Sequence, residues 1–173
     1  AHAASAEERD DFVGAEAGTG CGGHGVIRSI ARSRGAALPQ AAHDEEFLEL
    51  AARSGCKQLF LGLESVSQAS VDEVSKGFNR VAEYANAIGR IHAHGIAVQA
   101  GIVFGFDNDT EAVFDQTLEF LETTGVQNAT FNILTPFPGT RLYERMDAGG
   151  RILTRAWTRY NGRSDVVYQP RHM

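Results

Sequence analysis

The hydrophobic pattern divides the chain into two parts. Residues 1–42 are rich in Ala, Gly, Arg and Ser and show little sustained periodicity, whereas the pattern is regular from about Asp44 onward. The stretch "DEEFLELAARSG" predicts a helix, because Phe47, Leu48 and Ala51 share one face and acidic residues occupy the first turn. Gly55 is its expected C-terminal stop. We therefore treat 1–42 as a poorly patterned segment and 43–173 as the folded unit.

Three apolar runs predict strands. They are "QLFLGLES" at 58–65, "IAVQAGIVFGF" at 96–106 and "NATFNILT" at 128–135. The first run is almost continuously apolar, which is typical of a strand buried on both faces of a parallel sheet. Each run is preceded and followed by a segment of different periodicity, so the strands are expected to be separated by helices.

Helical patterns fill the intervals between these strands. We expect helices over 67–77, 79–95, 108–125 and 139–150. In the second, Asn79 is the expected N-cap, and the expected buried stripe is Val81, Tyr84, Ala85, Ile88, Ile91 and His92. In the third, Asn108 and Glu111 have capping-box spacing, and the expected buried face is Val113, Phe114, Thr117, Leu118 and Leu121. The tail is mixed, with a candidate strand at 165–168.

The order of these elements predicts an α/β fold. Strands that alternate with helices imply right-handed crossovers and a parallel sheet. The sheet is expected to be either a barrel of the (β/α) type or an open doubly wound sheet. In both architectures ligands bind at the carboxyl ends of the strands.

Each predicted strand ends in a polar or conformationally special group. The first ends in "GLES" at 62–65, the second in "GFD" at 105–107 and the third in "TPFPG" at 135–139. Prolines after Thr135 release the backbone from regular hydrogen bonding, so that its carbonyls and amides could contact a planar ligand. The alternative for Pro138 and Gly139 is a simple turn, since both residue types dominate turns for conformational reasons.

Polar residues at and within the strands are the sharper candidates. Glu64 follows an apolar strand directly, so its carboxylate must be solvated, paired or directed at a ligand; the structural alternative is a salt bridge with Lys76 or Arg80. Gln99 and Asn132 each lie inside an apolar strand. They predict an inner surface that approaches a ligand, where Gly101 leaves room, or else a mutually satisfied polar pair.

Composition narrows the classes of function. The 173 residues are 43% hydrophobic and 22% charged, with a net charge of -6. No basic stripe stands out, so nucleic acid is not the expected partner. No apolar run approaches the ~18 residues of a membrane span, and there is no signal-peptide pattern. Two cysteines, Cys21 and Cys56, form no disulfide framework, which favours a reducing, cytoplasmic compartment.

Four segments in order carry a resemblance to a known family. They are "SGCKQLFLGLESVSQASVDEVSKGFN", "HGIAVQAGIVFGFDND", "VFDQTLEF" and "FNILTPFPGTRLYERM". Together they resemble the second half of a radical SAM barrel, most closely that of enzymes with a cobalamin-binding domain upstream. The resemblance runs from about His43 to the C-terminus. It implies a partial parallel (β/α) barrel of the TIM type, of which this chain would be a fragment.

The resemblance also implies cofactors and a reaction. The family binds S-adenosylmethionine and a 4Fe-4S cluster at the carboxyl ends of the strands. It cleaves S-adenosylmethionine reductively, and the resulting radical abstracts a hydrogen atom from a small-molecule substrate. Methyl transfer through cobalamin, held by an upstream domain, is one outcome in the closest group. The expected partner of this chain is that domain or the missing N-terminal half of the barrel.

Site residues are implied position by position. Glu64 and Ser65 would line the S-adenosylmethionine pocket, and Lys76 would help to hold its carboxylate. The next wall would be formed by Gln99, Gly101, Gly105 and Asp107, and the adenine would lie against Leu134 and Pro136.

The cluster ligands that the family requires are missing from this sequence. The family holds its cluster through C-x-x-x-C-x-x-C, whereas Cys21 and Cys56 stand far apart. We therefore expect no independent catalysis, no metal ligands and no catalytic residues in this chain. Residues 1–42 would then be a frameshifted or truncated start. That expectation rests on the loss of periodicity before residue 43.

Two alternatives stay open at this point. One is a non-catalytic half-barrel that persists as a remnant or a partner-binding module. The other is an NAD(P)-binding α/β enzyme, because residues 18–23 match G-x-G-x-x-G and Asp44 lies at a suitable distance beyond them. The fingerprint requires a preceding strand, and "DDFVGAEA" is a poor one.

Overall fold

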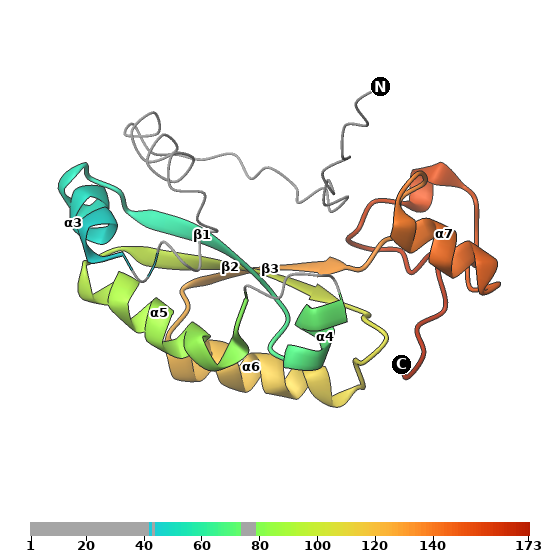
Figure 1. Ribbon diagram of the computed structural model, residues 1–173, viewed down its shortest axis with the longest axis horizontal. Helices are drawn as coiled ribbons and strands as arrows, with labels where there is room; N and C mark the ends of the chain where they lie inside the picture. The colour runs from blue at the N-terminus through green and yellow to red at the C-terminus, as the bar shows by residue number, and fades with distance from the viewer. Residues whose placement is uncertain (1–41, 43, 74–78) are drawn as a thin grey trace, which may run out of the picture.

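A computed structural model describes residues 42, 44–73 and 79–173, in which helices alternate with strands (Figure 1). The elements are α3 (Glu45–Arg53), β1 (Gln58–Glu64), α4 (Gln68–Glu73), α5 (Val81–Ala93), β2 (Ala97–Phe104), α6 (Ala112–Thr124), β3 (Asn128–Ile133), α7 (Arg141–Ala148) and the 3₁₀ helix η1 (Trp157–Arg159). The predicted α/β order is confirmed for this part of the chain.

The three strands form one parallel sheet in the order β1-β2-β3. Gln99 of β2 lies between Phe60 of β1 and Asn128 of β3; this register holds along the β2–β3 pair, and along the β1–β2 pair as far as Gly62. Parallel neighbours end at the same edge, so the segments after β1, β2 and β3 are brought together. The described residues thus form a three-stranded parallel sheet. The predicted parallel sheet is confirmed for them, and they do not close into a complete barrel.

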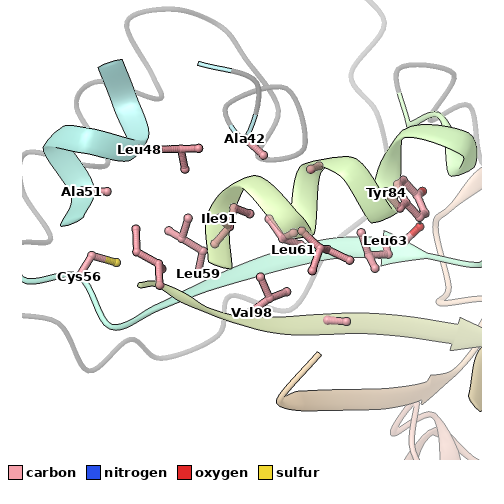
Figure 2. Close-up of a cluster of buried hydrophobic side chains, with 14 of the residues drawn as sticks. Ala42, Leu48, Ala51, Cys56, Leu59, Leu61, Leu63, Tyr84, Ile91 and Val98 are labelled. Atoms are coloured by element: carbon pink, nitrogen blue, oxygen red, sulfur yellow. The ribbon is translucent and has the colours of Figure 1, made fainter. Parts of the chain in front are cut away.

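The main core lies between one face of the sheet and the helices. Leu59, Leu61 and Leu63 of β1 are buried, and they belong to one cluster with Ile88 and Ile91 of α5. Figure 2 shows β1 passing beneath α5, with Leu59, Leu61, Leu63 and Ile91 gathered along it. The alternate residues of β1 are only half-buried, so the prediction of a strand buried on both faces is wrong. Alternation of this kind is typical of a sheet with one covered face.

The helix ends match the predictions in part. Asp44 caps α3 by accepting a hydrogen bond of 3.1 Å from the backbone N–H of Phe47. Gly125, with φ 65°, ends α6 as expected. Asn79, however, does not cap α5; the Oε1 of Gln68 accepts the N–H of Val81 instead, at 2.9 Å. Long-range contacts replace local capping here, and sequence spacing does not report them.

The predicted buried faces also need correction. Neither Asn108 nor Glu111 caps α6 with its side chain. Val113 and Thr117 are buried, but Phe114 and Leu118 are 47% and 56% exposed. On α5, Ala87 is buried and Ala85 is exposed, the reverse of the predicted stripe.

The segment after α7 folds back without forming a strand. In place of the predicted strand at 165–168, the described residues show one isolated antiparallel bridge between Ile152 and Tyr168. Tyr168 is fully buried in a second cluster with Phe106, Leu134 and Met146. Figure 1 shows this segment beside α7, beyond the carboxyl ends of the strands. None of the helices in the described ranges is long and apolar enough to cross a membrane.

A buried carboxylate fastens the loop after β2 to α4. Oδ2 of Asp109 accepts the N–H groups of Gly105 and Phe106, at 2.9 and 3.0 Å. Oδ1 accepts the hydroxyl of Ser70 at 2.6 Å. Asp109 is 1% exposed, so bulk water does not reach these hydrogen bonds to serve as an alternative acceptor for the three donors.

We therefore expect Asp109→Ala to lower the free energy of unfolding by about 3 kcal/mol, because three buried donors lose their acceptor. Urea unfolding followed by circular dichroism measures the change. Asp115→Ala, an exposed carboxylate on α6, is the matched control and should change stability by less than about 0.5 kcal/mol. Equal losses in the two variants would contradict the role given to Asp109.

Candidate functional site

The carboxyl end of β1 holds a strained acidic residue. Glu64 has φ 67°, and no other non-glycine residue in the described ranges has a positive φ. The sheet register shifts between Gly62 and Glu64, which marks a bulge, and Glu64 is only 7% exposed. A residue other than glycine in this region costs of the order of 1–3 kcal/mol, and such residues cluster at functional sites. The geometry therefore singles out Glu64 more strongly than its sequence position did.

Two side chains from the neighbouring segment support this bulge. Nδ2 of Asn79 donates to the carbonyl oxygen of Gly62 at 3.0 Å, and the hydroxyl of Tyr84 donates to that of Leu63 at 2.8 Å. Burial, and secondarily the negative charge of Glu64, raises the pKa of Tyr84, so its hydroxyl stays a donor. Sequence reasoning had placed both side chains elsewhere, Asn79 as a cap and Tyr84 only in the core.

The other predicted residues near β1 are placed as follows. Ser65 is 1% exposed, and its Oγ accepts the N–H of Ser67 at 3.1 Å. Lys76 lies outside the described residues. Nε of Arg80, the other predicted salt-bridge partner of Glu64, lies 4.0 Å from Oε1 of Glu83.

The sheet face opposite α5 is polar at its centre. Nε2 of Gln99 donates to Oγ1 of Thr130 across the β2–β3 pair at 3.0 Å. The alternative of a satisfied polar pair thus holds for Gln99, with Thr130 rather than Asn132 as its partner. Asn132 lies two residues beyond Thr130 on β3, opposite Val103 of β2.

Gly101 leaves room for a protein side chain. A Cβ placed on Gly101 would lie 2.7 Å from Cζ of Phe60 on β1. The Phe60 ring therefore occupies the space beside Gly101 in which the sequence predicted a ligand. Gly101 shapes the face through this contact.

Gly105 is fixed on both sides of its backbone. Its N–H donates to Oδ2 of Asp109, as described above, and its carbonyl oxygen accepts a hydrogen bond from the hydroxyl of Tyr168. Its φ is 107°, and a Cβ on it would lie 2.7 Å from the Tyr168 hydroxyl oxygen. Glycine is required here for both conformation and space.

Asp107 forms ion pairs with the segment that follows α7, residues 149–173, which we call the C-terminal segment. Its carboxylate receives two hydrogen bonds from Arg151, at 2.9 and 2.5 Å, and one from Arg171 at 3.1 Å. The hydrogen bond from Arg151 holds the pKa of Asp107 below its usual value. Its backbone N–H donates to Glu73 at 2.8 Å. Burial, with the nearby charge of Asp107, raises the pKa of Glu73.

The third strand end combines a turn with a helix cap. Leu134 is buried, and its N–H extends the β2–β3 pairing by donating to the carbonyl of Phe104 at 2.8 Å. Pro136 is also buried, whereas Pro138 and Gly139 are exposed. Gly139 has φ 84°, and Thr140 caps α7 by accepting the N–H of Tyr143 at 3.2 Å. The turn interpretation holds for Pro138 and Gly139, and Leu134 and Pro136 form its buried base.

The described residues do not fit an iron–sulfur cluster. They include one cysteine, Cys56, which is buried with its Sγ 3.4 Å from the carbonyl oxygen of Gln58. They contain no group of three or more His, Cys, Asp or Glu side chains that could hold a metal. Clusters of this kind take thiolate ligands. Cys21 and the G-x-G-x-x-G match at 18–23 lie outside the described residues, and Asp44 serves as a helix cap.

Comparison with known proteins gives homologues among methyltransferases. The chain is 37% identical over 116 residues to bacteriochlorophyllide d C-12(1)-methyltransferase of Chlorobaculum tepidum, covering 67% of this chain and 25% of that protein. It is 28% identical over 120 residues to bacteriochlorophyllide d C-8(2)-methyltransferase of the same organism, covering 69% and 27%. Hopanoid C-2 methylase of Rhodopseudomonas palustris is 28% identical over 108 residues, covering 62% and 20%. No family model matches the chain.

The chain spans about a quarter of the length of the curated relatives that it matches first. These relatives support the resemblance to the radical SAM superfamily drawn from the sequence.

The contact between Phe60 and Gly101 can be tested directly. We expect Gly101→Ala to destabilise the protein by about 2 kcal/mol, because the added methyl group overpacks against the Phe60 ring. Phe60→Leu in the same chain should recover part of the loss, which a double-mutant cycle of urea unfolding measures. Additive effects of the two substitutions would show that the Phe60 ring and Gly101 are not coupled.

The ion pair of Asp107 predicts a pH dependence. Its pKa in the folded protein is lowered from 3.8, so its contribution to stability is fully present above that value. The contribution is lost as the pH falls below about 4 and passes through the lowered pKa. Asp107→Asn should therefore reduce stability at pH 7 and flatten the acid limb of the stability curve. Thermal unfolding between pH 7 and pH 2 checks this, and an unchanged acid limb would contradict it.

Proposed function

We propose that this chain is part of a radical SAM enzyme and contributes a wall of its S-adenosylmethionine site. The observation that carries the proposal is Glu64, a buried carboxylate held in a strained backbone conformation at the carboxyl end of the parallel strand β1. Ligand sites of parallel α/β proteins lie at this edge. The similarity to methyltransferases favours group transfer to a small-molecule acceptor as the reaction of the whole protein.

The proposed contacts come from residues at and beside the strand ends. Glu64 and Ser65 would meet the polar part of S-adenosylmethionine, together with Lys76. Gln99, half-buried on the polar face of the sheet, would contact it from β2. Leu134 and Pro136 would support the adenine through the turn that they anchor. Gly101, Gly105 and Asp107 would act on the shape of the wall, because the structure commits their space or polar groups to other residues.

The remaining cofactors would be held by other parts of the enzyme. Since the described residues offer no set of thiolates, a 4Fe-4S cluster would take its ligands from outside them. Cobalamin, where used, would come from an upstream domain.

A second candidate is a partner-binding half-barrel. Phe131 on the outer strand β3 is 51% exposed, and it stacks on Phe104 with ring centroids 5.7 Å apart. The ring of Phe114 on α6 packs against the Phe104 ring, with the ring centroids 4.9 Å apart. With the exposed Leu118 these side chains form an apolar strip, and exposed apolar strips favour association. Sedimentation of the chain as a discrete oligomer without cofactor would favour this role.

Ligand-observed NMR of the purified chain with S-adenosylmethionine tests the proposed function. We expect weak saturable binding that Glu64→Gln reduces about tenfold, as the loss of a charged hydrogen-bond partner predicts. Glu119→Gln, an exposed carboxylate on α6, is the matched control and should leave binding unchanged. Binding of NAD(P) instead of S-adenosylmethionine would overturn the proposal. Equal S-adenosylmethionine binding by Glu64→Gln and Glu119→Gln would also overturn it.

A further inference from the structure

The C-terminal segment reaches back to the loop after β2 at three points. Tyr168 donates its hydroxyl to the carbonyl of Gly105, and Arg151 and Arg171 bind the carboxylate of Asp107. The loop and this segment are more than 40 residues apart in the sequence. No sequence motif announces these contacts, yet they involve two residues that the proposed function places at the ligand wall.

The contact at Gly105 is buried and specific. Tyr168 is fully buried, and its ring packs with Phe106, Leu134 and Met146. Burial raises the pKa of Tyr168, so the hydroxyl remains a hydrogen-bond donor throughout the physiological range. Because Asp109 accepts the N–H of Phe106, the peptide between Gly105 and Phe106 is bonded at both its carbonyl and its N–H, which fixes it in one orientation.

The contact at Asp107 is held from several directions. Nε of Arg151 donates to the carbonyl of Gln169 at 2.9 Å, and its guanidinium carbon lies 5.8 Å from the centre of the Tyr168 ring. The Arg151 and Asp107 side chains are 17% and 16% exposed, so their ion pair is shielded from water. Glu73, which accepts the Asp107 N–H, is itself paired with Arg145 of α7 at 3.1 Å.

We propose that Tyr168 and Arg151 are positioning residues that hold the loop 105–109 in the shape required by the S-adenosylmethionine wall. This inference rests on the proposed function, since it assigns the wall a support outside the sheet. The C-terminal segment would thereby affect ligand binding without touching the ligand. Its effect would pass through the carbonyl of Gly105 and the carboxylate of Asp107.

Hydrogen exchange and ligand binding in the same variants test the inference. Tyr168→Phe keeps the ring in its cluster but removes the hydroxyl. We expect exchange of the Gly105 and Phe106 amides to accelerate about tenfold, and S-adenosylmethionine affinity to fall about five- to tenfold. Arg151→Met should loosen Asp107 in the same way. Tyr160→Phe is the matched control, because its hydroxyl donates to the carbonyl of Thr154 at 2.6 Å within the same segment.

The possible outcomes separate this inference from the proposed function. Unchanged exchange at 105–107 in Tyr168→Phe overturns the hold on the loop, whatever the ligand does. Faster exchange with unchanged affinity overturns the link to the site. Equal effects of Tyr160→Phe would show general loosening instead. If the unmodified chain does not bind S-adenosylmethionine, the proposed function and the link to the site both fail, and exchange alone then decides the hold on the loop.

Discussion

Every strand of a parallel sheet must leave its ladder, and the backbone groups just beyond it then need new partners. That requirement shapes the carboxyl edge of this protein. Asn79 and Tyr84 take the carbonyls of Gly62 and Leu63, and Asp109 takes the amides after β2. Tyr168 takes the carbonyl of Gly105. The candidate site is therefore built on loops whose conformation is set by side chains from residues 79–84, from the loop after β2 itself and from the segment after α7.

Local patterns predicted the elements well, because each depends on residues close in sequence. Phe47, Leu48 and Ala51 were expected on the buried face of α3, and all three are buried there. The positions of Glu64 and Gly105 at the strand ends were also predicted from the sequence, since a polar or flexible residue after an apolar run is conspicuous. Their partners were not found. A hydrogen bond such as that from Tyr168 to Gly105 joins positions 63 residues apart, and no period or spacing encodes it.

The errors on α6 have a different physical origin. Phe114 and Leu118 follow the helical period of a buried face, yet they are half-exposed at the β3 side of the sheet. An amphipathic pattern reports which residues avoid water, not which element covers them. Together with Phe131 they suit a further covering layer, which either candidate function would supply: the rest of an enzyme in one case, a partner chain in the other.

The strain at Glu64 helps to decide between these two functions. A partner-binding sheet gains nothing from a left-handed glutamate at a bulge, because the cost of about 1–3 kcal/mol would be avoided by glycine. Bulges such as the one between Gly62 and Glu64 re-aim side chains at strand ends, and they are common beside active sites. Asn79 and Tyr84 stabilise the same bulge from outside, so the fold maintains the strain. That arrangement favours a site at which the carboxylate itself is needed, and hence the cofactor-binding interpretation over the purely structural one.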